Sequence, residues 1–168
     1  GGVGFEMTVY KFHAFRLCEY DKVVIFDADM SIIDDVSEIF TNEIKFGALY
    51  DVKNEDFSED LFKIRETEYF NSGIMVIDKE WLKEDVIIGC DEILKNGLLN
   101  EEINIKHHKG LYPEQDLLNV YFRNDEVTII PRHYSADRFY CDENNFKDVK
   151  IIHYLTYLKP WIYQDYEG

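Results

Sequence analysis

Five short, mainly apolar runs stand out along an otherwise polar chain. Such runs are typical of strands that are buried in a sheet, and the first of them is rich in β-branched residues. They occupy residues 22–27, 46–50, 73–78, 127–130 and 149–154.

Apolar residues also recur at helical spacing before the first of these runs and between later ones. The helices predicted from this spacing cover residues 7–20, residues 79–95 and a stretch that begins at Pro113. A shorter helix is expected around residues 36–40, whereas residues 51–68 and 98–112 are predicted to be mostly irregular. Because strands and helices alternate, we expect an α/β fold in a single domain over residues 1–168.

Composition narrows the classes of partner. The chain has 168 residues, of which 46% are hydrophobic, so it can bury a core. Its formal net charge of −16 argues against binding to nucleic acid or to anionic membranes, because both require a basic surface. A nucleotide ligand stays compatible with this charge, since a metal ion and a few cations can offset the local field.

The cysteines and the chain ends bear on location. The three cysteines are far apart and form no Cys-x-x-Cys motif, so we expect reduced thiols. We find no signal peptide and no apolar stretch long enough to span a bilayer, and from this we expect a cytoplasmic protein. The chain begins with Gly1 rather than methionine, and we therefore expect it to be part of a longer polypeptide.

The most informative residues follow the first strand. Asp27 and Asp29 come directly after the buried run and are one residue apart, so alternation along a strand would place them on one side. Ligands usually bind at the carboxyl ends of strands in α/β sheets. Two carboxylates there suit Mg²⁺ or Mn²⁺, and such an ion can hold a diphosphate.

Four motifs occur in a fixed order. They are Phe26-Asp27-Ala28-Asp29, Phe70-Asn71-Ser72-Gly73, Glu114 to Asn119, and His153-Tyr154 followed by Lys159-Pro160-Trp161. Their order and content resemble the retaining glycosyltransferases of family 8, which include glycogenin, galactinol synthase and bacterial lipopolysaccharide galactosyltransferases. The resemblance covers nearly the whole chain. The first strand and helix units of the family, which hold uracil and ribose, would precede residue 1.

The resemblance implies a fold, an activity and a cofactor. The fold is GT-A, a Rossmann-like mixed sheet flanked by helices. The activity is transfer of a hexose from a UDP-sugar to a saccharide or another hydroxyl acceptor, with retention of configuration. The cofactor is Mn²⁺, with Mg²⁺ as the alternative, and its implied ligands are Asp27, Asp29 and His153. Assembly into a homo-oligomer stays open.

The resemblance also implies donor-binding and catalytic residues. Gln115 and Asp116 match the positions beside the anomeric carbon, and for Gln115 we prefer a positioning role. The residues that match donor contacts are Arg16, Ala28, Asp51, Asn71, Ser72, Gly73 and Lys159. Within this set, Lys159 would neutralise the diphosphate, and the Asn-Ser-Gly turn would contact the transferred sugar.

The sequence departs from the family pattern at two places. Glu114 stands where the family often has aspartate. Residues 155–158 contain no glycine, although the family usually has one there, where its backbone approaches the phosphate. The second departure puts part of the expected phosphate contact in question.

Two alternatives remain at this point. One is an incomplete or non-catalytic piece of the fold that only binds ligands, because a fold does not by itself specify an activity. The other is a phosphatase of the haloacid-dehalogenase type, in which Asp27 would be the nucleophile, Asp29 the acid/base, and Ser31 a motif residue. The phosphatase alternative lacks a convincing downstream acidic pair and gives the segment from His153 to Trp161 no role.

Overall fold

The computed structural model describes residues 9–41, 43–50, 69–96, 113–136, 146–155, 159 and 161. Its strands are β1 (Lys22–Phe26), β2 (Met30–Ile32), β3 (Phe46–Tyr50), β4 (Phe70–Asp78), β5 (Thr128–Ile130) and β6 (Ile151–His153). Its α-helices are α2 (Asp85–Lys95) and α5 (Pro113–Tyr121), and its 3₁₀ helices are η1 (Val9–Arg16), η2 (Ser37–Phe40), η4 (Arg132–Tyr134) and η5 (Phe146–Asp148).

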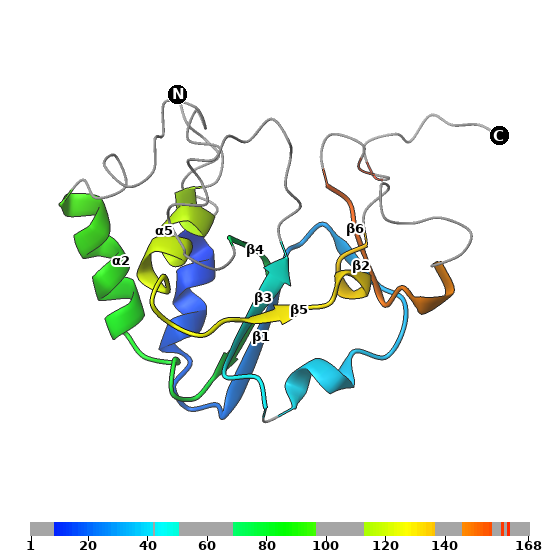
Figure 1. Ribbon diagram of the computed structural model, residues 1–168, viewed down its shortest axis with the longest axis horizontal. Helices are drawn as coiled ribbons and strands as arrows, with labels where there is room; N and C mark the ends of the chain where they lie inside the picture. Colours follow the sequence, from blue (N-terminus) through cyan, green and yellow to red (C-terminus); the bar gives the residue numbers. More distant parts are fainter. Residues whose placement is uncertain are drawn as a thin grey trace.

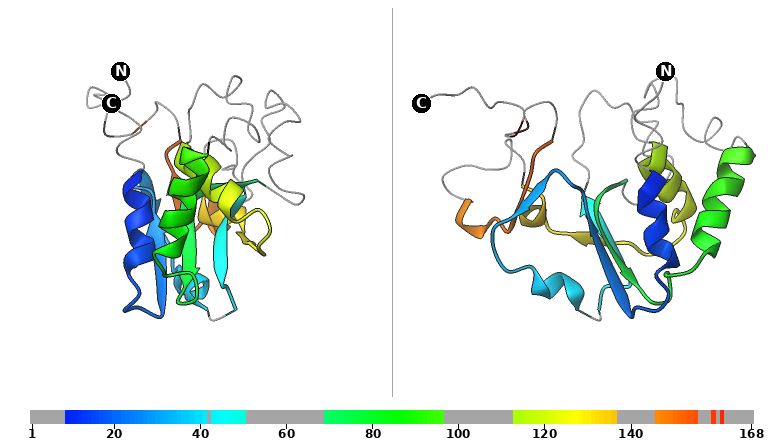
Figure 2. Two further views of the ribbon diagram at one scale, coloured as in Figure 1. Left: turned by 90° about the vertical axis from the view of Figure 1, so that its left-hand side faces the viewer. Right: turned by 180° about the vertical axis from the view of Figure 1, so that it is seen from behind.

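The strands form a mixed four-stranded sheet and a separate two-stranded sheet (Figure 1). In the larger sheet the order is β1-β4-β3-β5, with β4 antiparallel to both neighbours and β5 parallel to β3. The smaller sheet pairs β2 with β6 in antiparallel fashion. Helices η1, α2 and α5 lie to one side of the larger sheet, and the smaller sheet lies to the other (Figure 2).

Strand β4 supplies core residues to both faces of the larger sheet. Met75 and Ile77 pack with the helices, whereas Ile74 and Val76 pack towards the smaller sheet. This alternation follows from the pleat of a strand, and burial on both faces explains why the sequence here is continuously apolar. The helix-side core contains several aromatic rings, and Phe46 and Phe122 stack there with ring centroids 4.0 Å apart.

Near its start, β4 is irregular. Its register with β3 shifts between Ala48 and Leu49, which pair with Met75 and Asn71 respectively. Ala48 and Leu49 are adjacent in β3, whereas their partners in β4 are separated by three residues, Ser72 to Ile74. Extra residues in one strand of a pair bend that strand. The side chain of Asn71 stabilises the bend by accepting a hydrogen bond from Gly73 N at 2.8 Å.

Each of the five predicted strands overlaps an observed strand, and the α/β prediction is confirmed. Three details of the prediction are wrong. Asn71-Ser72-Gly73 was expected to form a turn but lies inside β4, β2 was not predicted as a strand, and α2 begins at Asp85 rather than near residue 79. None of the helices in the described ranges is long and apolar enough to cross a membrane.

The stacked aromatic core gives a stability prediction. Phe122 is fully buried, and its ring also meets the edge of Trp81 at a centroid distance of 5.0 Å. We expect Phe122→Ala to lower the free energy of unfolding by about 3–5 kcal/mol, because it leaves a cavity. Chemical denaturation measures this, with Phe146→Ala as the control. Phe146 is 53% exposed, so its truncation should cost less than about 0.5 kcal/mol. Equal losses for both variants would contradict the prediction.

Candidate active site

The turn between β1 and β2 carries both aspartates of the first motif. The sequence had indicated that Asp27 and Asp29 continue one strand and point to the same side of it. However, strand β1 ends at Phe26, so neither aspartate belongs to it. Instead, the backbone fixes them separately. Asp27 N donates to Gly73 O at 2.8 Å, and Asp29 O accepts from Tyr154 N at 2.9 Å. The turn is thus held between the first sheet, through β4, and the second sheet, just past β6.

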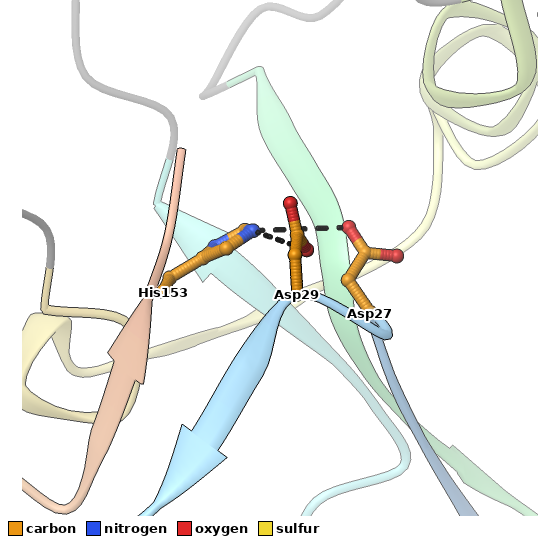
Figure 3. Close-up of side chains that lie close together, drawn as sticks. All are labelled: Asp27, Asp29 and His153. Atoms are coloured by element: carbon orange, nitrogen blue, oxygen red, sulfur yellow. Dashed lines mark ion pairs between the residues drawn. The ribbon is translucent and has the colours of Figure 1, made fainter. Parts of the chain in front are cut away.

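Asp27, Asp29 and His153 converge at this turn (Figure 3). His153 Nε2 lies 3.3 Å from Asp29 Oδ1 and 4.0 Å from Asp27 Oδ2. One potential ligand atom from each residue lies within 4.8 Å of the other two, so the three side chains could hold a metal ion. Two carboxylates with one imidazole form a donor set that suits first-row divalent ions.

The protonation states favour metal binding. Burial lowers the pKa of His153, and the opposing effect of Asp29 and Asp27 does not reverse this. Burial raises the pKa of Asp29, but the hydrogen bond from Lys159 and the charge of His153 outweigh it, so the pKa lies below its usual value. A neutral imidazole and an ionised carboxylate are the forms that bind metal ions.

Each of the two carboxylates pairs with a lysine. Lys11, from η1, lies 2.6 Å from Asp27 Oδ1, and its ammonium also donates to Ser72 O at 3.3 Å. Lys159 donates to Asp29 Oδ2 and to Tyr154 O. Both lysine side chains are less than one-fifth exposed. The pair of lysines therefore balances the charge of the pair of aspartates.

Gly73 forms the wall against which the imidazole of His153 lies. A Cβ atom at this position would lie 2.9 Å from His153 Cε1 and 3.1 Å from Met30 Cε. It would also lie 2.8 Å from Asn71 Oδ1, which bonds to the glycine's own N–H. The glycine therefore allows the ring to approach the backbone of β4 closely enough to face the carboxylates.

Helix α5 brings the third motif to the start of β4. Gln115 Oε1 accepts a hydrogen bond from Ser72 N at 3.1 Å, and Asp116 Oδ1 accepts one from the Tyr69 hydroxyl at 2.5 Å. Asn119 is fully buried, and its side chain bonds to both backbone groups of Phe70 and to Gln115 O, at 2.8–2.9 Å. The side-chain amide of Asn119 thus pairs with the backbone of Phe70 in the way that a neighbouring strand would.

Glu114, at the first turn of α5, brings a third carboxylate close to the site. It is 6% exposed, and its Oε1 lies 3.8 Å from Lys11 Nζ. Its Oε2 is buried and has no hydrogen-bond partner among the residues that the structure describes. A buried acceptor without a donor is costly, and it is therefore available to a donor group of a ligand.

The structure gathers most of the residues that the sequence pointed to. Asp27, Asp29 and His153 meet, Ala28 lies in the turn between the aspartates, Asn71, Ser72 and Gly73 form the adjacent strand, and Gln115 and Lys159 contact that assembly. Asp116 accepts a hydrogen bond from Tyr69, which directly precedes β4. Asp51 lies outside the described residues.

Arg16 lies elsewhere. Its guanidinium pairs with Glu84 Oε1 at 2.9 Å, and both side chains are about half exposed. Glu84 follows the carboxyl end of β4, whereas Ser72 lies near the start of that strand. The η1 cation that reaches Asp27 is Lys11, which the sequence analysis missed. Lys11 and Arg16 both belong to η1, and the separation of five positions takes them to different ends of it.

Comparison with known proteins agrees with this geometry. The sequence matches the family description "Glycosyl transferase family 8" over residues 5–165. The chain belongs to glycosyltransferase family 8. It is 26% identical to human glycogenin-2 over 168 residues, which is 94% of this chain and 28% of that protein. It is 25% identical to the glycosyltransferase GlyF of Streptococcus pneumoniae over 168 residues, or 92% of this chain and 37% of GlyF.

The fold is GT-A, as the resemblance implied. A solved structure of the galactosyltransferase LgtC, in complex with donor and acceptor sugar analogs, superposes with a TM-score of 0.64 at 21% sequence identity. The match covers 96% of this chain and 63% of LgtC. The chain thus spans less than two-thirds of the length of each of these relatives.

The clamp formed by Asn119 gives a second prediction. We expect Asn119→Leu to lower the free energy of unfolding by about 2–4 kcal/mol, because it removes three buried hydrogen bonds, two to the backbone of Phe70 and one to Gln115 O. Thermal and chemical denaturation measure the loss. The control is Asn96→Leu at the exposed end of α2, which should cost less than about 0.5 kcal/mol. An unchanged stability of the Asn119 variant would contradict the clamp.

Proposed function

We propose that this chain carries the metal and diphosphate site of a Mn²⁺-dependent retaining glycosyltransferase that transfers a hexose from a UDP-sugar to a hydroxyl acceptor. The observation that carries the proposal is the convergence of Asp27, Asp29 and His153 between two lysines, in a chain of family 8. The nucleotide-sugar donor and the sugar acceptor are inferred for this chain from the family and from the LgtC complex.

Charge supports a diphosphate ligand. Lys11 and Lys159 balance Asp27 and Asp29, burial favours a neutral His153, and Glu114 adds one negative charge beside Lys11. A divalent cation would therefore turn the charge of this group of residues from negative to positive. A diphosphate is the complementary ligand, and the two lysines lie where they could contact its oxygens. When bound, Mn²⁺ would stabilise the charge that develops on the UDP leaving group. The lysines would add to that stabilisation from the protein side.

The start of α5 is the proposed location of the reacting sugar. Gln115 is held by Ser72 N and Asp116 by the Tyr69 hydroxyl, so both side chains are positioned before any ligand arrives. Glu114 Oε2, which has no hydrogen-bond partner within the described part of the chain, is a suitable acceptor for a sugar hydroxyl. As its oxygen is already bonded to the backbone, Gln115 fits a positioning role better than that of a nucleophile.

The phosphatase alternative is not favoured. It leaves His153 without a function, yet the structure buries this residue against both aspartates. The match to family 8 over residues 5–165 also favours glycosyl transfer.

Calorimetric titration with UDP, with and without Mn²⁺, tests the proposal. We expect UDP to bind in the presence of Mn²⁺ and Asp29→Asn to reduce binding to the metal-free level, because the variant loses an ionised ligand. The matched control is Asp91→Asn, which removes an exposed carboxylate paired with Lys95 on α2 and should bind as the unaltered chain does. UDP binding that depends on neither Mn²⁺ nor Asp29 would contradict the metal assignment.

Release of UDP from UDP-hexoses in the same samples separates catalysis from binding. Mn²⁺-dependent release that is lost in Asp29→Asn is the expected result. Mn²⁺-dependent binding of UDP without any release would instead identify a ligand-binding piece that does not turn over by itself.

Gly73 offers a further prediction with a built-in control. We expect Gly73→Ala to weaken Mn²⁺ binding, because the added Cβ displaces the imidazole of His153. A Cβ at Gly89 would meet the ring of Tyr121 at 2.3 Å, between α2 and α5. Gly89→Ala should therefore lower stability by about 1–3 kcal/mol through overpacking, without changing Mn²⁺ affinity. Equal Mn²⁺ affinity in both variants would contradict the proposed role of Gly73.

A further inference from the structure

We propose that Ser135 is a positioning residue that holds His153 so that its Nε2 atom faces the cation. The proposal rests on the proposed function, because it concerns the same metal site. Ser135 Oγ lies 3.0 Å from His153 Nδ1, on the side of the ring away from the aspartates. Ser135 belongs to none of the four motifs by which the sequence was recognised.

The backbone fixes Ser135 beside His153. Residues 133–136 run alongside residues 150–153 and are joined to them by backbone hydrogen bonds. The bonds run from Lys150 N to His133 O at 2.9 Å, from Ala136 N to Ile151 O at 3.0 Å and from His153 N to Ala136 O at 2.9 Å. An isolated parallel bridge between Ala136 and Ile152 belongs to the same pairing. The serine hydroxyl thus reaches the imidazole from a segment that cannot slide relative to β6.

The chemistry of imidazole gives this contact its function. A neutral ring carries one proton, and the nitrogen that binds a cation must offer its lone pair. If Nε2 binds the cation, the proton lies on Nδ1, and the serine oxygen accepts its hydrogen bond. A hydroxyl can also donate, so Ser135 satisfies Nδ1 in either tautomer. His153 is only 4% exposed, so solvent is a poor substitute for this partner.

Gly73 supports the ring from another direction. The imidazole lies against its Cα, with too little space for a Cβ atom beside Cε1. Ser135 on Nδ1 and the β4 backbone beside Cε1 together define one orientation of the ring. In that orientation Nε2 is the nitrogen closest to Asp29 and Asp27. Hydrogen bonds of this type orient metal-binding histidines in proteins, and their loss typically weakens metal affinity by about 10–100-fold.

The test is the affinity of this chain for Mn²⁺ alone, measured by electron paramagnetic resonance of the free ion. We expect Ser135→Ala to weaken Mn²⁺ binding by about 10–100-fold. The matched control is Ser37→Ala, since the Ser37 hydroxyl bonds only to the exposed carboxylate of Asp35 among the described residues. Ser37→Ala should leave the affinity unchanged. An unchanged affinity in Ser135→Ala would overturn the proposal.

A second pair of variants removes any ambiguity from misfolding. Ser135→Thr keeps the hydroxyl and Ser135→Val replaces it with a methyl group of similar shape, so both add the same bulk. We expect the threonine variant to bind Mn²⁺ at least about tenfold more tightly than the valine variant. Equal affinities of these two variants would overturn the proposal, whatever the stability of Ser135→Ala.

A double-mutant cycle shows whether Ser135 acts through His153. In a His153→Ala background, Ser135→Ala should have no further effect on Mn²⁺ affinity. An equal loss in both backgrounds would indicate a general structural effect and overturn the proposal. If the unaltered chain binds no Mn²⁺, the proposed function fails, and the role of Ser135 fails with it. If that chain binds Mn²⁺ and the serine variants do so equally well, only the role of Ser135 fails.

Discussion

The structure depends on keeping two carboxylates close together beside one buried imidazole. Asp27 and Asp29 both lie within 4.0 Å of His153 Nε2, so each carboxylate must be compensated. The compensation comes from Lys11 and Lys159, which belong to distant parts of the chain. The site therefore exists only when η1, the β1–β2 turn, β6 and Lys159 are assembled together. This explains why its parts are spread over almost the whole sequence.

Strand β4 makes that assembly possible. On one edge Gly73 O accepts from Asp27 N and fixes the turn, and at its start Phe70 is held by Asn119 of α5. Between these points the strand bends, and the bend exposes Ser72 N to Gln115 and brings Gly73 against His153. A regular strand could not serve all of these partners. The irregularity near Asn71 thus shapes the candidate site, and bulges are common beside active sites.

The sequence predicted the larger strands because burial on both faces requires continuous apolar runs. It also identified Asp27, Asp29 and His153 through family motifs, and the geometry brings these residues together. Three features escaped prediction for physical reasons. Strand β2 is short and partly exposed, so it leaves no hydrophobic pattern, and the bend in β4 depends on pairing with β3. The choice between Lys11 and Arg16 depends on which end of η1 lies beside the β1–β2 turn, and this is set by tertiary packing rather than by the local sequence.

The overall charge of the chain places a final constraint on the site. A formal net charge of −16 would repel a nucleotide diphosphate at low ionic strength. At physiological ionic strength, however, exposed charges are screened beyond about 8 Å, so the carboxylates elsewhere on the surface contribute little. The local balance then decides, and it is set by Asp27, Asp29 and Glu114, the two lysines and any bound cation. Without a cation the aspartates neutralise the lysines that a diphosphate would need. Metal and diphosphate should therefore bind with positive cooperativity, each creating the charge that the other requires.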